Sequence, residues 1–415
     1  MKKILAIVAA VAVVSSVASA QLLKNFKLHD SLLEVNAYNL NNADFNDNQG
    51  DKKGDVDTRL MLNMSFDLND DANTVVTVVK NNRQWGDGQA PENLNALQNN
   101  IKVHQAYVNL KGVLGMDHKL GRQFYGNPGD LVIYYGPKMW PYQKYIGNVN
   151  AIDAFVPMYN YKDWAFTGII GKEVNTPNDM GTNLSGIDIK KKIDRFNLNA
   201  YYYYKVDNTA KDQLGLYGFR ANWEFKYLEG LNLGLEYDRN AGSDSNYNKY
   251  KGYAYKVNAG YTTDKVAGKL GLNAEYAYLS GDNNTTDTNN KTYTSIADDY
   301  RPGIIVGGLW VNPLNYNYLG DGNKIIKLGL NWTPEKLNKL NLAFDYINFK
   351  AAKKTTGMTE DTFGNEYDIV ATWNHSDKIS LKGYYAMFKP EKKNLNVTNP
   401  GDMETMLGGA FVIKF

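Results

Sequence analysis

The sequence predicts an all-β fold: a transmembrane antiparallel up-and-down β-barrel of about 18 strands, with short periplasmic turns and long extracellular loops. Three features of the chain predict it. Apolar and polar residues alternate with a period of two, the connections are alternately short and long, and a secretion signal is followed by no long apolar helix. A soluble β-sandwich would mix its loop lengths at both ends, so the combination favours a closed sheet in a membrane.

The alternation is clear in the final stretch, where Leu407, Phe411 and Phe415 fall on one face and Met406 and Val412 on the other. If the apolar row faces lipid, the strand must pair on both sides, because its backbone groups find no water there. The last strand is therefore expected to close onto the first. Strands are expected at 27–40, 57–68, 74–84, 101–110, 118–124, 151–157, 163–172, 184–193, 196–206, 214–227, 231–239, 252–263, 267–280, 324–333, 339–349, 365–374, 379–388 and 405–415.

The connections between these strands alternate in length, which is the pattern of a meander with one short-turn end and one long-loop end. Only 207–213 is intermediate. A strand number of 16 or 20 also stays open, because 151–157 is weak and 304–310 could add a strand. The long connections are 41–55, 85–100, 125–150, 173–183, 240–251, 281–323, 350–364 and 389–404.

Residues Met1–Ala20 read as a signal peptide: two lysines, an apolar run and an Ala-Ser-Ala cleavage site. Residues 21–415 then form a single barrel domain in the outer membrane of a Gram-negative bacterium. The chain has no cysteine, a net charge of +2, and 31 Tyr, 15 Phe and 7 Trp. So many rings in a chain with a mean hydropathy of −0.49 suit aromatic girdles around a wet lumen.

Charged residues alternate with the apolar rows, and they would cost a few kcal/mol each if they faced the middle of a bilayer. We therefore expect them to face a water-filled lumen. Positive and negative charges nearly balance on these inward rows, which favours ion-pair ladders over strong anion selectivity. The residues that this pattern places along the pore are Arg59, Lys190, Arg220, Glu224, Lys226, Lys256, Glu275, Lys327, Asp345 and Lys382.

The stretch from His118 to Tyr159 resembles the alginate-export family of outer-membrane barrels. Gly121-Arg122-Gln123 ends a strand, a glycine-rich segment with Trp140 follows, and Asp153 lies in the next strand. The resemblance implies a passive conduit for an anionic polysaccharide, Arg122 in the lumen, and a constriction at the 125–150 loop. Its predicted residues are Tyr125, Asp130, Trp140 and Asp153. Alternatively, Arg122 bonds Asp153 or the backbone and only fixes the loop.

These features favour a channel for hydrophilic solutes, such as sugars or an anionic polysaccharide, in contact with outer-membrane lipid. The final strand, ending at Phe415, resembles the signal read by the barrel-assembly machinery. The alternative is an adhesive barrel whose long loops, 281–323 above all, bind an external partner. We expect no enzyme activity, cofactor, metal or nucleic-acid partner. A hydrolase would have to rely on His104, the only histidine inside a strand, and no catalytic motif accompanies it.

Overall fold

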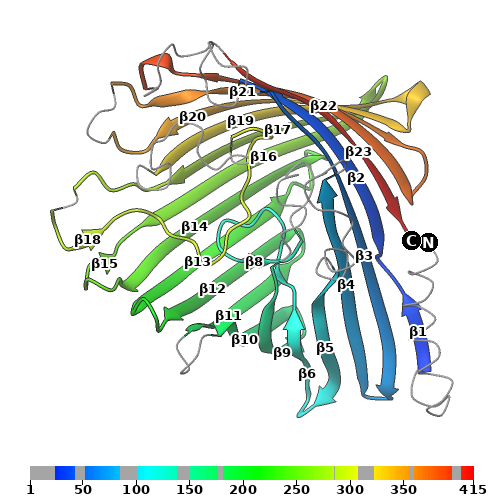
Figure 1. Ribbon diagram of the computed structural model, residues 1–415, viewed down its shortest axis with the longest axis vertical. Helices are drawn as coiled ribbons and strands as arrows, with labels where there is room; N and C mark the ends of the chain where they lie inside the picture. The colour runs from blue at the N-terminus through cyan, green and yellow to red at the C-terminus, as the bar shows by residue number, and fades with distance from the viewer. Residues whose placement is uncertain are drawn as a thin grey trace.

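The computed structural model describes residues 24–42, 52–84, 101–137, 150–175, 181–284, 286–306, 322–354, 359–394 and 403–415. Within these ranges one antiparallel sheet curls into a closed barrel (Figure 1). The first and last wall strands pair from Leu32↔Lys414 to Asn41↔Thr405. This closure satisfies the backbone groups of both strands, as the periodicity of the final stretch predicted.

Eighteen strands form the wall of the described barrel, which is the 21-stranded sheet without the short strands β1, β15 and β18. The prediction of about 18 strands is confirmed, and each wall strand overlaps a predicted one. They are β2 (Leu32–Asn41), β3 (Lys53–Asn69), β4 (Ala72–Gln84), β5 (Ile101–Val113), β6 (Met116–Gln123), β9 (Ile152–Tyr161), β10 (Trp164–Asn175), β11 (Gly181–Ile193), β12 (Phe196–Asp207), β13 (Asp212–Glu224), β14 (Leu231–Ser243), β16 (Tyr253–Val266), β17 (Gly268–Leu279), β19 (Asn323–Pro334), β20 (Leu340–Ala351), β21 (Thr362–Asn374), β22 (Ile379–Pro390) and β23 (Glu404–Lys414).

The smaller elements lie at the ends of the wall or within the connections. β1 pairs with the turn end of β3, β7 pairs with β8, and β15 lies parallel to β18. No helix among the described residues is long and apolar enough to span a bilayer. The bounds are β1 (Lys24–Leu28), β7 (Tyr125–Gly126), β8 (Tyr134–Tyr135), β15 (Lys249–Tyr250), β18 (Asn289–Asn290), η3 (Glu335–Leu337) and η4 (Lys392–Asn394).

The wall strands alternate between an exposed apolar outer row and a polar inner row. In β19, Ile326, Leu328 and Leu330 are exposed on the outside. Lys327 of the same strand faces inward and forms an ion pair with Asp345 of β20. Because a charge on the outer row would meet hydrocarbon in a membrane, this division is what a lipid-embedded barrel requires.

Several strand boundaries differ from the prediction: the first predicted strand, 27–40, is divided between β1 and β2, and β13 is shorter than expected. The alternation predicts a strand that continues to Tyr227, but β13 ends at Glu224. Beyond it the chain turns, with the Phe225 amide donating to the Leu231 carbonyl and Gly230 at a φ of +87°. Phe225 stacks on Trp223 at 4.2 Å between ring centroids. The alternation of aromatic residues therefore continues past the last hydrogen-bonded residue of the strand.

Two long connections fold into the barrel instead of away from it. The cyan segment around β8 and the yellow segment after β18 both run within the ring of strands (Figure 1). Each forms a buried apolar cluster with the wall. Leu131, Val132 and Ile133 pack among wall residues that include Ile152 and Ile169. The second cluster joins residues 304–306 to phenylalanines of β20 and β22.

Candidate functional site

The first inward connection is the segment 125–137, which forms a small hairpin inside the barrel. β7 and β8 pair through Tyr125↔Tyr135 and Gly126↔Tyr134. Gly126 has a φ of +85°, and a Cβ there would meet the Ile133 carbonyl oxygen at 2.1 Å. Only glycine fits this backbone conformation and this close approach. The hairpin therefore depends on a specific residue as well as on the length of the connection.

Asp130 lies at the tip of the hairpin, where it holds the turn and joins it to the wall. Its Oδ1 accepts hydrogen bonds from the Val132 amide at 2.7 Å and the Ile133 amide at 3.3 Å. The same oxygen accepts from Arg220 Nη2 at 2.6 Å. Burial raises the pKa of the Asp130 carboxyl above its ordinary value, the Arg220 guanidinium opposes that shift, and Glu236 adds to it.

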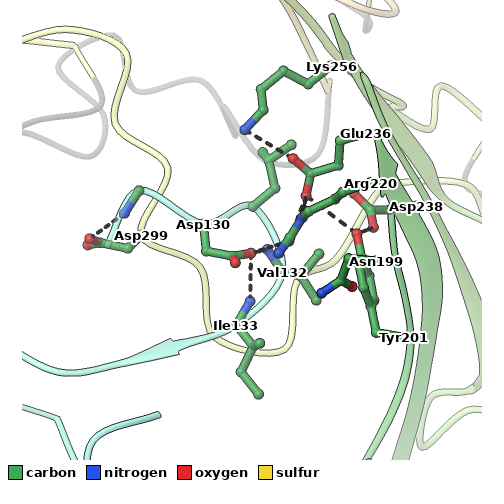
Figure 2. A network of polar contacts seen from close by, with 12 residues as sticks. Asp130, Val132, Ile133, Asn199, Tyr201, Arg220, Glu236, Asp238, Lys256 and Asp299 are labelled. Atoms are coloured by element: carbon green, nitrogen blue, oxygen red, sulfur yellow. Dashed lines mark hydrogen bonds and ion pairs between the residues drawn. The ribbon is translucent and has the colours of Figure 1, made fainter. Parts of the chain in front are cut away.

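Arg220 of β13 is the centre of a charged network on the inner wall, shown in Figure 2. Its Nε donates to Glu236 Oε1 of β14 at 2.7 Å, and Lys256 of β16 lies 3.0 Å from Glu236 Oε2. The guanidinium also lies over the Tyr201 ring, 4.7 Å from its centroid. The strand register places Arg220, Glu236 and Lys256 opposite one another, so their signs alternate across three strands. The wall thus fixes the arginine that holds the hairpin.

The second inward connection, 293–306, is hydrogen-bonded to the first along its backbone. The Ile296 amide donates to the Val132 carbonyl at 3.0 Å, and the Tyr134 amide donates to the Ala297 carbonyl at 2.6 Å. Asp299 Oδ2 accepts from the Gly129 amide at 3.1 Å. These bonds join two connections that lie more than 150 residues apart in the chain.

The far end of this segment is held by two carboxylates of β21. Glu366 accepts from the amides of Ile305 at 2.6 Å and Val306 at 2.9 Å. Asp368 accepts from the Ile304 amide at 3.2 Å. β13 and β21 are separated in the wall by β14, β16, β17, β19 and β20. The two joined segments therefore cross the inside of the barrel from β13 to β21. They narrow the lumen.

Next to these segments is an open space with a polar lining. A cavity of about 470 Å³ lies between the inward segments and strands β14, β16, β17 and β19. Tyr300 reaches across it to donate a hydrogen bond to Glu275 of β17 at 2.6 Å. Its charged lining residues are Lys256, Glu275, Asp299, Arg301 and Lys327. Both signs are present, so the space can bind water and hydrophilic groups without a strong preference for one charge.

Most predicted lumen residues do face inward. Lys190 lies 3.8 Å from Asp188 and borders a smaller cavity with Tyr125 and Asp130. Arg59 is fully buried and paired with Glu34 at 2.7 Å. The inner rows also carry Arg220, Lys256, Glu275, Lys327, Asp345 and Lys382.

Two further predicted residues lie at the turn end of β13. Glu224 is the exposed last residue of the strand, and Lys226 lies in the following turn beside the Tyr227 ring. They are at the turn end, away from the inward segments. The predicted pore-lining position of Lys226 is wrong, because the strand assumed to carry it has already ended. Trp140 lies outside the described residues.

The lumen position predicted for Arg122 is wrong, and so is the place of Asp153 in the constriction. Arg122 shares its face of β6 with Leu120, which is 52% exposed on the outside. Asp153 shares its face of β9 with Phe155, while Ile152 and Ala154 point inward and are buried. Arg122 and Asp153 form an ion pair with each other at 3.2 Å. The bond to Asp153 that the alternative expected is present, and the role of this ion pair in fixing the loop stays a prediction.

Sequence reasoning missed Tyr201, Asp299 and Tyr300. Tyr201 donates to Asp238 Oδ1 at 2.6 Å, and its ring packs against the Arg220 guanidinium. Tyrosine is so frequent in this chain that one more gave no signal. Asp299 and Tyr300 lie in a long connection whose length indicated importance but not the direction in which it folds.

No protein-family model matches the chain, and no curated protein matches it. Solved structures do. The outer membrane protein OprD from Pseudomonas aeruginosa superimposes with a TM-score of 0.60 at 12% identity, covering 95% of each chain. OccAB1 of Acinetobacter baumannii gives 0.61 at 10% identity over 95% of this chain and 98% of that one. The chain has the fold of these outer-membrane barrels. OccD3 (OpdP) of P. aeruginosa also superimposes, with a TM-score of 0.59 at 12% identity, covering 95% of this chain and 92% of that one.

Proposed function

We propose that the chain is a channel of the Gram-negative outer membrane through which small hydrophilic solutes diffuse passively. The observation that carries the proposal is the pairing of an apolar outer face with a charged inner wall around a narrowed lumen. A barrel with 18 strands is too wide for its wall side chains to fill, so the inward segments set the size of the path. A cavity of about 470 Å³ accommodates a small molecule.

The solute is proposed to be small and not strongly selected by charge. Arg220, Lys256 and Lys327 each form an ion pair with a carboxylate. These three side chains therefore do not form a row of unpaired positive charge along the lumen. The finer assignment to alginate export stays a prediction. Its motif residues Arg122 and Asp153 face outward, which removes the support they gave to a basic pore for an anionic polysaccharide.

Solute flux into proteoliposomes tests the proposal. Liposomes that contain the purified chain should swell when diluted into an isotonic solution of a small neutral sugar, and liposomes without it should not. Larger sugars should enter progressively more slowly, because the two inward segments limit the path. Equal and negligible swelling with every solute would contradict a diffusion channel.

The adhesive alternative receives no support from the described loops. Its main candidate segment was 281–323, yet Ile296, Ile304 and Ile305 of that connection are buried inside the barrel. A binding loop has to present its side chains to an external partner. This part of the connection instead presents them to the inner wall.

A further inference from the structure

The outer surface of β19 to β22 is graded in polarity from the middle of the wall to the long-loop end. Leu328, Phe344 and Ile369 are exposed in the apolar middle. Nearer the loops, Tyr346 and Tyr367 contact each other at 5.4 Å between ring centroids. Apolar side chains followed by tyrosines mark the boundary between hydrocarbon and headgroups in a membrane protein.

Above the tyrosines the outer surface becomes polar and then basic. Asn365 Oδ1 accepts from Tyr346 at 2.9 Å and from Asn348 at 2.7 Å. Three lysines lie at this height or nearer the loops, each one residue from the loop end of its strand, and Lys389 is the direct cross-strand partner of Asn365. Lys324 is the second residue of β19, and Lys350 and Lys389 are the penultimate residues of β20 and β22. We call Lys324, Lys350 and Lys389 the lysine belt.

The lysine belt faces outward, as the neighbouring residues show. Asn323 and Ile325 on either side of Lys324 are buried inside, and so are Phe349 and Ala351 on either side of Lys350. Lys389 likewise lies between the buried Phe388 and Pro390. With a period of two, the lysines must point away from the lumen.

In the part of the chain that the structure describes, no acidic side chain neutralises the belt. Lys324 and Lys350 are direct cross-strand partners, an arrangement of like charges that is unfavourable without a counter-ion. Among the described residues, no carboxylate forms an ion pair with any of the three lysines. The outward rows of β17, β19, β20, β21 and β22 contain no acidic residue.

The opposite arrangement is found elsewhere on the same barrel. Arg122 is the penultimate residue of β6 and Asp153 is the second residue of β9, and both face outward at the long-loop end. There the Asp153 carboxylate neutralises the Arg122 guanidinium, with Asp153 Oδ2 at 3.2 Å from Arg122 Nη1. The lysine belt is thus an unneutralised basic patch at the height where lipid headgroups lie.

We propose that the lysine belt binds the phosphate groups of an anionic outer-leaflet lipid. The inference rests on the proposed membrane location, since only an embedded barrel brings headgroups to this height. Compact ammonium groups on flexible stems suit a phosphate that approaches from the side. Tyr346 and Tyr367 below them would contact the upper part of the acyl chains and the glycolipid ring.

The test compares the full barrel with the triple variant Lys324→Gln/Lys350→Gln/Lys389→Gln in detergent micelles. Native mass spectrometry measures the dissociation constant for purified lipid A carrying two phosphates. Each lysine near a phosphate contributes about fivefold in affinity, so the triple variant should bind about 100-fold more weakly. Lys191→Gln is the matched control, because Lys191 faces outward beside Trp164 at the short-turn end. It should bind lipid A like the wild type.

Three results would overturn the inference: equal lipid A affinity in wild type and triple variant, equal affinity of the wild type for dephosphorylated lipid A, or displacement of lipid A by millimolar inorganic phosphate. The last would indicate a general anion site and not a lipid site. Because the lysines face outward, the triple variant should swell liposomes as the wild type does. A wild type that binds lipid A but passes no solute would refute the channel and leave the lipid site standing.

Discussion

Replacing Asp130 by Asn should release the hairpin from the wall while leaving its turn intact. The amide oxygen of Asn can still accept from the Val132 and Ile133 amides, which now bond to Asp130 Oδ1. What disappears is the ionic bond to Arg220 at 2.6 Å. A hydrogen bond to a charged group contributes about 1.5–3 kcal/mol. We take about 2 kcal/mol, because Arg220 keeps Glu236 as a partner and is not left isolated.

Hydrogen exchange of the hairpin amides measures this release directly. A loss of about 2 kcal/mol raises the population of the opened hairpin about 30-fold, and exchange at Val132 and Ile133 should accelerate by the same factor. Peptides from β11 in the same sample provide an internal reference. Asp287→Asn is the matched control, since it removes the carboxylate that forms an ion pair with Lys291 in another connection, while the amide oxygen can still accept from the Asn289 amide. Hairpin exchange within twofold of the wild type in Asp130→Asn would refute the anchoring role of Arg220.

Three further outcomes follow from the geometry. Gly126→Ala should disrupt the β7–β8 hairpin, because its Cβ would overlap the Ile133 carbonyl at a φ of +85°, and hairpin amides should lose protection while wall amides keep theirs. Lys256→Glu should turn a nearly non-selective channel cation-selective, seen as a shifted reversal potential in a salt gradient; an unchanged potential would place Lys256 off the path. Arg122→Gln should leave single-channel conductance unchanged, since Arg122 faces outward, and a clear change would contradict its assigned face.

The wall of the barrel could be predicted because each strand carries its own signal. Leu328 and Leu330 alternate with Lys327 and Asn331 along β19 whatever the rest of the chain does. The same rule would have placed Arg122 correctly, since it is two residues from Leu120. The family resemblance favoured the lumen instead, and the period of two was the better guide.

The folded-in connections could not be predicted in the same way, because their contacts are distant in sequence. Asp130 meets Arg220 across 90 residues, and the Ile305 amide meets Glu366 across 61. Alternation shows which strand residues face inward but not which loop segment reaches them. The family resemblance implied a constriction at the 125–150 loop, and the described part of that loop, up to residue 137, does fold into the barrel.

Single-channel recording from purified chain in a planar bilayer tests the central claim most directly. Wild type should insert in discrete steps of constant conductance, because each closed barrel encloses one aqueous path. A chain that lacks the hairpin residues 127–133 should show larger steps, because the segment that narrows the lumen is gone. Absence of any current in both proteins, with the barrel shown to be folded, would contradict the account.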